Sequence, residues 1–194
     1  MAFLRAVSVV ETGPQLKTEN LVLRLPQISD YVAWSELRSV SRSALQPFEP
    51  KWAKNELSRD AFRNRLRFYQ RDFRESTGFP FFIFKAECGS LTGAITLSNV
   101  RRGVTQSGSI GYWTGVPFQG QGIMTEALCK IIDYSMTTLK LHRIEAASLK
   151  HNGSSMRVLE KCGFQREGVA RKYHCIDGRW QDHILYSIIE DDLK

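Results

Sequence analysis

A glycine-rich turn separates an extended segment from a helical one just past the middle of this 194-residue chain. Residues 109–114 have the pattern of a strand, Gly120 and Gly122 lie in the turn, and a helical pattern follows. Glycine lacks a Cβ atom, so the backbone can turn sharply there and leave its N–H groups uncovered. The first N–H groups of a helix have no intrahelical partner, and the helix dipole adds positive potential at the same end. The turn therefore predicts a binding site for a phosphate or pyrophosphate group.

Two common phosphate-binding motifs do not match this turn. A P-loop requires a lysine directly after its last glycine, but Ile123 follows Gly122. A dinucleotide-binding fingerprint requires a third glycine, where Thr125 stands, and an early βαβ unit. The turn taken alone does not distinguish a nucleotide, a dinucleotide and coenzyme A.

Charge and composition restrict the class of protein. The formal charge is +7 and the sequence pI is about 9.4. This surplus favours an acidic partner, such as a nucleotide-like cofactor, an RNA-bearing particle or an acidic peptide, although a basic surface can simply aid solubility. The four cysteines include no Cys-x-x-Cys pair, which disfavours a zinc site and a disulfide scaffold.

The sequence contains no recognisable membrane segment or signal peptide. No apolar run approaches the roughly 20 residues that a membrane helix needs, and the N-terminal segment is not a convincing signal peptide. We therefore expect a cytoplasmic protein with no bound metal and no membrane partner. The sequence does not distinguish a monomer from a dimer.

Hydrophobic periodicity predicts a single domain of the α+β or α/β class, with a mixed, mostly antiparallel sheet flanked by helices. The expected element order is β-α-α-β-β-β-α-β-α-β-β. The domain should cover residues 21–190, and residues 1–20 should form an N-terminal arm or an edge strand. The expected strands are 21–26, 79–85, 91–100, 107–114, 142–149, 164–176 and 180–189, the last two joined about Asp177 and Gly178. The expected helices are one capped by Asp30, then 55–74, 123–139 and 153–161.

The expected helix 55–74 is strongly basic. Its apolar residues recur at three- and four-residue steps, so one side belongs to the core. The opposite side carries six arginines, Arg59, Arg63, Arg65, Arg67, Arg71 and Arg74. These arginines form either a solvated face or a contact surface for ribosomal RNA or an acidic substrate tail, and we favour the first interpretation.

The segment 45–52 contains two prolines and two aromatic residues that look exposed. It is either a packed connection or one wall of a substrate site. Because loops commonly carry specificity, we favour the second interpretation and expect Phe48, Glu49 and Trp52 to contact a substrate.

Two motifs together narrow the function. The segment Gln119-Gly120-Gln121-Gly122-Ile123-Met124 resembles the Gln/Arg-x-x-Gly-x-Gly/Ala signature of the GNAT N-acetyltransferases. The segment 152–155, Asn-Gly-Ser-Ser, followed by Gly163 and Phe164, resembles the family's second landmark, Asn-x-x-Ser with a closing Gly-Phe. The resemblance extends over roughly residues 21–189. Within the family, segments 45–50, 110–113 and 176–183 most resemble the bacterial ribosomal-protein alanine N-acetyltransferases of the RimJ/RimL group.

The resemblance implies acetyl-CoA as the acetyl donor. Backbone N–H groups of the turn would hold the pyrophosphate, and the strand before it would run beside the pantetheine arm and supply an N–H to the thioester oxygen. Asn152 would bind the pantetheine, although a plain helix cap would also explain it. The implied cofactor-binding residues are Tyr112, Trp113, Thr114, Gln119, Gly120, Gln121, Gly122, Ile123, Met124, Thr125, Asn152 and Ser155.

Met124 departs from the family signature, which has a small residue at this position. If the position contributes only a backbone N–H, a side chain that points away is tolerated. If the side chain faces the pyrophosphate, cofactor affinity would suffer.

Acetyl transfer to an amine requires the ammonium to lose a proton, the carbonyl to be polarised and the leaving thiolate to be protonated. Many GNATs use a tyrosine of the short helix as the acid, but the aligned residue here is Leu159. The resemblance assigns the acid to Ser155, with a capping or packing serine as the alternative. It assigns the base to His174, where RimL-like enzymes have a glutamate; a half-exposed strand histidine is the alternative, and Glu145 is a rival base.

Other polar residues receive lesser roles. Asp182 is expected to shape the acceptor cleft, and Glu126 is expected to stabilise the start of a helix. Cys129 and Cys162 fall on helix positions that look buried. We therefore expect direct transfer in a ternary complex rather than an acetyl-cysteine intermediate.

Three functions follow from these observations. The first is an enzyme that acetylates the N-terminal alanine α-amine of a ribosomal protein. The second is an acetyltransferase of a small amine, such as a polyamine or an antibiotic. The third is a non-catalytic factor that binds RNA or the ribosome through the basic helix. The few acidic residues in the expected acceptor loops mildly favour a peptide over a polyamine.

Overall fold

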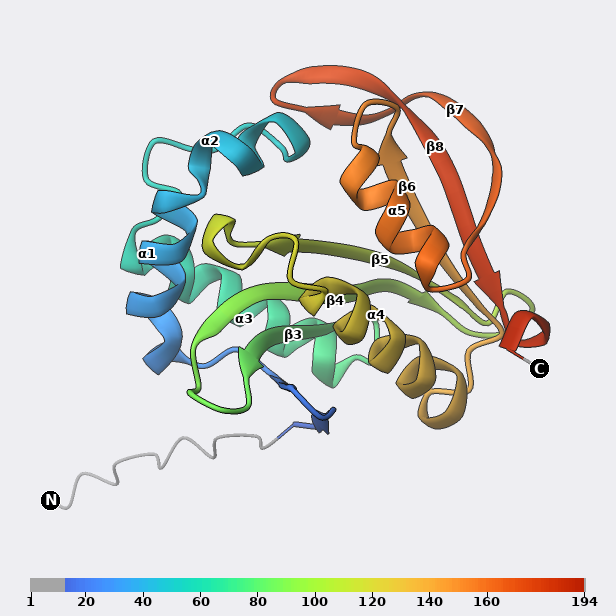
Figure 1. The fold of residues 1–194 in the computed structure, drawn as a ribbon, viewed down its shortest axis with the longest axis horizontal. Helices are drawn as coiled ribbons and strands as arrows, with labels where there is room; N and C mark the ends of the chain where they lie inside the picture. The colour runs from blue at the N-terminus through green and yellow to red at the C-terminus, as the bar shows by residue number, and fades with distance from the viewer. Residues whose placement is uncertain (1–12, 194) are drawn as a thin grey trace, which may run out of the picture.

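The computed structural model describes residues 13–193, which contain one eight-stranded sheet with helices on both faces (Figure 1). The strand order is β1-β2-β3-β4-β5-β6-β8-β7, and all neighbours are antiparallel except β5 and β6. The strands are β1 (Gln15–Lys17), β2 (Leu21–Arg24), β3 (Phe79–Lys85), β4 (Leu91–Arg101), β5 (Ser107–Thr114), β6 (Arg143–Leu149), β7 (Gln165–Ile176) and β8 (Arg179–Ile189). The expected fold class is thereby confirmed.

The α-helices are α1 (Tyr31–Val40), α2 (Arg42–Leu45), α3 (Arg59–Arg74), α4 (Ile123–Asp133) and α5 (Gly153–Lys161). Short 3₁₀ segments are η1 (Ile28–Asp30), η2 (Gln46–Phe48), η3 (Val116–Phe118) and η5 (Glu190–Leu193), and a π-helical turn, η4 (Tyr134–Thr138), extends α4. No helix among residues 13–193 is long and apolar enough to cross a membrane.

Two apolar cores lie on the two faces of the sheet. Successive residues of β3 alternate between them, because side chains in a strand point to opposite faces. Phe81 and Ile83 join the core beneath α4 and α5, whereas Phe82 and Phe84 join the core beneath α1 and α3. Figure 1 shows α4 and α5 in front of the sheet and α3 behind it. Helices α4 and α5 thus cover one face of the sheet, and α1 and α3 cover the other.

Several local features differ from the expectation. The basic helix begins at Arg59 rather than at residue 55, because the Ser58 side chain accepts the Ala61 N–H and so caps it. Asp30 precedes α1, but its carboxylate does not cap that helix; it binds Arg24 at 2.6 and 2.8 Å and the Gln27 N–H at 2.7 Å. Part of the expected loop 45–52 is helical, since α2 ends there and η2 follows.

The N-terminal strand belongs to the same sheet. Strand β1 pairs antiparallel with β2, so residues 15–17 form an edge strand. Residues 1–12 of the expected arm lie outside the described residues. Glu126 of α4 accepts hydrogen bonds from the Thr18 hydroxyl at 2.5 Å and the Asn20 N–H at 3.1 Å. Glu126 lies in the first turn of α4, as expected, and it also anchors this edge of the sheet to α4.

Candidate active site

The parallel strands β5 and β6 pair along only part of their length. Their register joins Ser107–Ser109 to Arg143–Glu145. Strand β5 then continues to Thr114 in pairing with β4, and β6 continues to Leu149 in pairing with β8. Between residues 110 and 114, the β5 edge that faces β6 therefore has no ladder bond to it. Such an edge offers backbone groups to an extended ligand, in the manner of strand addition.

The glycine-rich turn follows directly from this free edge. Gly120 and Gly122 have φ angles of +73° and +78°, and Gly122 is the N-cap of α4. Residues with a side chain rarely adopt this left-handed conformation. A Cβ atom built on either glycine would have no heavy atom within 4 Å. The turn thus leaves open space in front of the α4 N-terminus, as an anion cradle requires.

The two glutamines of the turn brace the turn itself. Gln119 Nε2 donates to the Thr114 carbonyl at 3.3 Å, and Gln121 Nε2 donates to the Pro117 carbonyl at 2.9 Å. The turn is also tied to the other face of the sheet, because the Val116 N–H donates to the buried Ser41 hydroxyl at 2.9 Å. These contacts hold the backbone of the cradle in place.

Met124 does not face the cradle. Its side chain is only 7% exposed and packs in the core beneath α4 and α5. Met124 therefore contributes only its backbone to the turn, and its side chain leaves the space of the cradle free.

The short helix α5 places Asn152 and Ser155 beside β5. Asn152 is the N-cap of α5, and its side-chain oxygen accepts the Ser155 N–H at 3.1 Å. The Ser155 hydroxyl lies 3.0 Å from the hydroxyl of Tyr112, which comes from the free part of β5. Three of the expected site residues are thus brought together. The contact between Tyr112 and Ser155 was not anticipated, because the two residues lie 43 positions apart and no sequence pattern links them.

The environment of Tyr112 keeps its phenol protonated. Burial raises the pKa of Tyr112 to about 12, and the hydrogen bond to Ser155 opposes this shift only in part. By contrast, Leu159, the position at which many family members carry a tyrosine, is buried with 1% exposure. A tyrosine hydroxyl near the first turn of α5 is thus supplied by β5, not by position 159.

The expected acceptor loops meet at one end of the sheet. The Asp177 N–H donates to the Glu49 carbonyl at 2.9 Å, so the tip of the β7–β8 hairpin is bonded to the segment after η2. Figure 1 shows the hairpin reaching across to the α2 region. Phe48, 38% exposed, lies with its ring centroid 5.7 Å from that of His151. Phe48 is therefore placed where a substrate could touch it.

Glu49 and Trp52 have structural contacts that the sequence did not indicate. Trp52 is 8% exposed rather than open to solvent, and its indole N–H donates to the Glu49 carboxylate at 2.8 Å. Arg38 binds the same carboxylate at 2.6 and 2.7 Å and lies over the Trp52 ring. The expectation that Trp52 is exposed is wrong, because its ring packs against this ion pair.

His174 lies on the exposed part of β7, beside two aromatic neighbours. Its ring centroid is 4.8 Å from that of His183 and 4.2 Å from that of Tyr173. Partial burial, and then the nearby His183, lower the pKa of His174 below its usual range. A histidine with a lowered pKa is neutral at physiological pH and can accept a proton. No hydrogen bond among the described residues joins His174 to Ser155.

Two other carboxylates are already engaged. Glu145 accepts from Arg143 Nε at 2.9 Å, lies 3.6 Å from Arg101, and sits where β5 and β6 are still paired. Its ion pairs and its position argue against the role of rival base. Asp182 accepts from Lys150 Nζ at 3.0 Å and from the Lys172 N–H at 3.0 Å, so it braces the hairpin.

The two helix cysteines differ in exposure. Cys162 is buried and Cys129 is exposed, so the expectation that both are buried is wrong for Cys129. Their sulfur atoms lie 3.4 Å apart. Burial raises the pKa of the Cys162 thiol to about 12, which makes it a poor nucleophile near neutral pH.

A comparison with protein-family models identifies the architecture. The model described as "Acetyltransferase (GNAT) domain" matches residues 20–165. This chain belongs to the GNAT acetyltransferases. It is therefore an acyltransferase, and the recognition made from its two motifs is confirmed.

Individual relatives within the GNAT family place it more closely. The chain is 37% identical over 177 residues to the "Probable N-acetyltransferase YjcK" of Bacillus subtilis, covering 91% of this chain and 98% of the relative. It is 33% identical over 180 residues to the "[Ribosomal protein uS5]-alanine N-acetyltransferase" of Escherichia coli, covering 92% of each. The solved structure of "Mycobacterium smegmatis RimJ in complex with CoA-disulfide" has a TM-score of 0.85 at 32% identity, covering 94% of this chain and 88% of that one. This GNAT enzyme is thus of the RimJ type.

Proposed function

We propose that this enzyme transfers the acetyl group of acetyl-CoA to the N-terminal alanine α-amine of a ribosomal protein. The observation that carries the proposal is the open cradle at the α4 N-terminus, continuous with the free edge of β5. Coenzyme A has a pyrophosphate, which fits the cradle, and an extended pantetheine arm, which fits the adjoining free edge of β5. The names of the Escherichia coli relative and of the M. smegmatis structure support the acceptor and the donor, respectively.

The cradle would hold the donor through backbone groups. The N–H groups of residues 120–125 would bind the pyrophosphate, with the α4 dipole adding to the attraction. The free edge of β5 would pair with the amide groups of the pantetheine arm. Asn152 would have to share its side chain between its helix-cap bond and the donor, because its oxygen already accepts from Ser155.

Two residues would carry the proton transfers in a direct reaction. His174, neutral because of its lowered pKa, would take the proton from the acceptor ammonium, directly or through water. Ser155 would give its proton to the departing sulfur. The amine nitrogen would form the new bond to the acetyl carbon while the bond to sulfur breaks, and the second proton that this nitrogen loses would return to Ser155, directly or through water, to restore the hydroxyl. The high pKa of Cys162 favours this route over an acetyl-cysteine intermediate.

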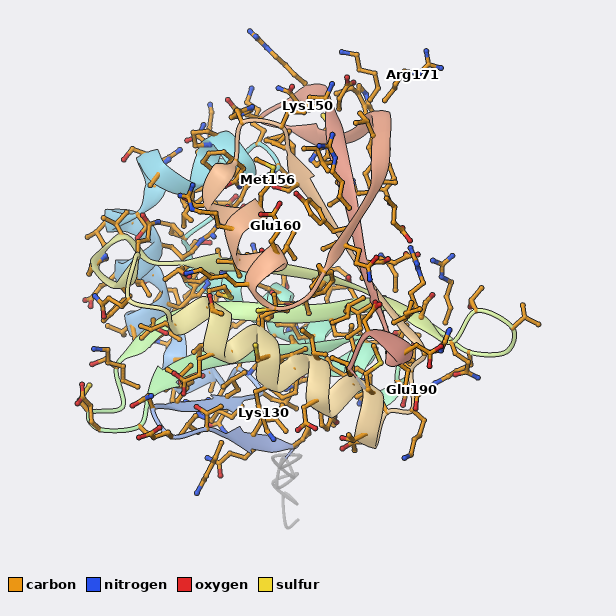
Figure 2. The ribbon with its side chains drawn as sticks, turned by 45° about the vertical axis from the view of Figure 1, so that its right-hand side comes forward. Lys130, Lys150, Met156, Glu160, Arg171 and Glu190 are labelled. Atoms are coloured by element: carbon orange, nitrogen blue, oxygen red, sulfur yellow. The ribbon has the colours of Figure 1, made fainter. Side chains whose placement is uncertain are left out.

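Charge at the acceptor end favours a peptide over a polyamine. A cavity of about 210 Å³ lies beyond the end of β6 and is lined partly by Lys150, His151 and Lys172. Figure 2 shows Lys150 and Arg171 at this same end of the molecule. The carboxylates of Glu49 and Asp182 are each paired with a cation. A polyamine would therefore meet like charge here, without free carboxylates at these two positions to offset it.

The proposal can be tested with defined acceptors. The full chain is incubated with acetyl-CoA and one of three amines, namely a synthetic ribosomal-protein N-terminal peptide that begins with alanine, spermidine, or a chloramphenicol-like amine. Thiol release and peptide mass are followed. We expect an added acetyl group on the peptide α-amine, and no reaction with the same peptide after chemical N-acetylation.

Turnover with spermidine alone would favour the small-amine function. Absence of turnover together with salt-dependent binding of ribosomal RNA would favour the non-catalytic factor, whose surface would be the exposed arginines of α3.

A further inference from the structure

The hydroxyl of Tyr112 reaches from the free part of β5 to the first turn of α5. Its oxygen lies 3.0 Å from Ser155 Oγ and 3.2 Å from the Ser155 carbonyl oxygen. We propose that Tyr112 is the positioning residue of the acid, donating a hydrogen bond to Ser155 Oγ so that the Ser155 hydrogen points to the leaving sulfur. This inference rests on the proposed function, in which Ser155 is that acid.

The direction of the hydrogen bond decides whether Ser155 can act. The Tyr112 hydroxyl has one hydrogen, and either oxygen of the pair could be the donor. If Ser155 donated to Tyr112, its hydrogen would be consumed and no acid would remain. A phenol is a stronger acid than an aliphatic alcohol, so the pair is better satisfied when Tyr112 donates. The Ser155 carbonyl oxygen, at 3.2 Å, is a second acceptor within reach of the Tyr112 hydrogen, but Ser155 Oγ is the nearer of the two at 3.0 Å.

The same serine is held from a second side. The Ser155 N–H donates to Asn152 Oδ1, so the residue is fixed in the first turn of α5. In a helix, a serine hydroxyl left alone often turns back to bond the carbonyl one turn earlier. A hydrogen bond from Tyr112 instead holds Ser155 Oγ in the position that faces β5. Asn152 thus fixes the backbone of Ser155, and Tyr112 fixes its hydroxyl.

Burial makes Tyr112 suited to this role. Its ring packs against the core beneath α4 and α5, and its raised pKa keeps the hydroxyl neutral throughout the physiological range. A neutral phenol always has a hydrogen to donate. The same chemical group that many family members supply from α5 therefore comes here from β5, while position 159 contributes only an apolar side chain.

The experiment uses Tyr112→Phe, Ser155→Ala and the double variant in the peptide assay. Tyr112→Phe keeps the ring and removes only the hydroxyl. We expect its kcat to fall by about tenfold, the value of one lost hydrogen bond, with the KM for acetyl-CoA changed less than twofold. In the Ser155→Ala background, the same substitution should lower kcat by less than twofold, because the hydroxyl it would position is gone.

Tyr186→Phe is the matched control. Tyr186 also runs from the sheet to α5, and its hydroxyl donates to Glu160 at 3.2 Å, away from Ser155. We expect this variant to retain wild-type kcat even if it loses as much thermal stability as Tyr112→Phe.

Equal tenfold losses from Tyr112→Phe with and without Ser155 would show a merely structural role and overturn the inference. Wild-type kcat in Tyr112→Phe beside an impaired Ser155→Ala would overturn it while sparing the proposed function. Wild-type kcat in Ser155→Ala would instead remove the proposed acid and with it the inference.

Discussion

The backbone N–H of Asp177 donates a 2.9 Å hydrogen bond to the carbonyl oxygen of Glu49, which joins the β7–β8 hairpin to the segment after η2. Gln46 Nε2 adds a second bond, 3.3 Å long, to the Asp177 carboxylate. The Glu49 side chain points to Arg38 instead. The two loops that bound the proposed acceptor end are thus one connected structure. The Glu49 backbone bonds to the hairpin, and its carboxylate bonds to Arg38.

The Arg38–Glu49 ion pair predicts a large stability effect. Arg38 is only 5% exposed, so Glu49→Ala would leave a buried guanidinium without its counter-ion. We expect the free energy of unfolding to fall by about 3 kcal/mol. Urea unfolding measures this change. The control is Glu87→Ala, because the Lys85–Glu87 pair is 3.6 Å long and Glu87 is exposed; it should change stability by less than about 1 kcal/mol. Comparable losses of unfolding free energy in both variants would contradict the argument that the burial of Arg38 makes its ion pair important.

Substitution of Gly122 by valine should separate donor binding from folding. Gly122 has φ +78°, and a Cβ atom there would project into open space in front of α4. We expect the left-handed backbone to cost about 1–2 kcal/mol of stability. The side chain would also occupy the space proposed for the pyrophosphate, so the Kd for CoA in calorimetry should rise at least about tenfold.

Gly168→Ala serves as the control for that substitution. Gly168 lies on β7, has open space around a built Cβ, and needs no left-handed conformation. Its alanine variant should bind CoA like the wild type. An unchanged Kd in Gly122→Val would contradict the phosphate cradle.

Local sequence signals predicted local structure well. The pair Asp177-Gly178 predicted a tight hairpin turn, and both residues have positive φ angles, +43° and +77°. Asn152 was expected to cap α5, and its side chain does so. In each case the residue type itself carries the physical preference, either for the left-handed backbone or for a free helix N–H. Such features need no knowledge of the tertiary contacts.

Features that depend on distant partners could not be read in this way. Trp52 looked exposed within a proline-containing loop, but Arg38 and Glu49 cover it. The partner of Ser155 is Tyr112, on another element, and periodicity cannot reveal which strand residue faces which helix residue. The candidate site was therefore predictable as a set of motifs, whereas the pairing of its side chains required the fold.

The lowered pKa of His174 predicts the pH dependence of catalysis. A base must be unprotonated, so kcat/KM should be constant near neutral pH and fall as the pH drops through a value below the usual histidine pKa of about 6.5. The same shift means that the unfolded chain binds this proton more readily. The contribution of His174 to stability is therefore present above the unfolded pKa and is lost as pH falls through the folded pKa.

His174→Gln tests this assignment. The variant should lose about 100-fold in kcat/KM and no longer show the acidic limb of the profile. The control is His142→Gln, because His142 is exposed and directly precedes β6. This variant should retain the wild-type kcat/KM and the acidic limb of its pH profile. An acidic limb that persists in His174→Gln would assign the base to another group.

Cysteine environments predict an order of alkylation. Cys88 is exposed, and its hydrogen bonds to Ser90 lower its pKa, whereas burial raises that of Cys162 to about 12. Because the thiolate is the reactive form, iodoacetamide at pH 7.5 should modify Cys88 early and Cys162 last. Peptide mass spectrometry over a time course measures the order, and the same reaction in strong denaturant should remove the difference. A Cys162 that reacts as fast as Cys88 in the native protein would reopen a cysteine intermediate. Continued full activity after selective Cys88 modification would agree with direct transfer from donor to amine.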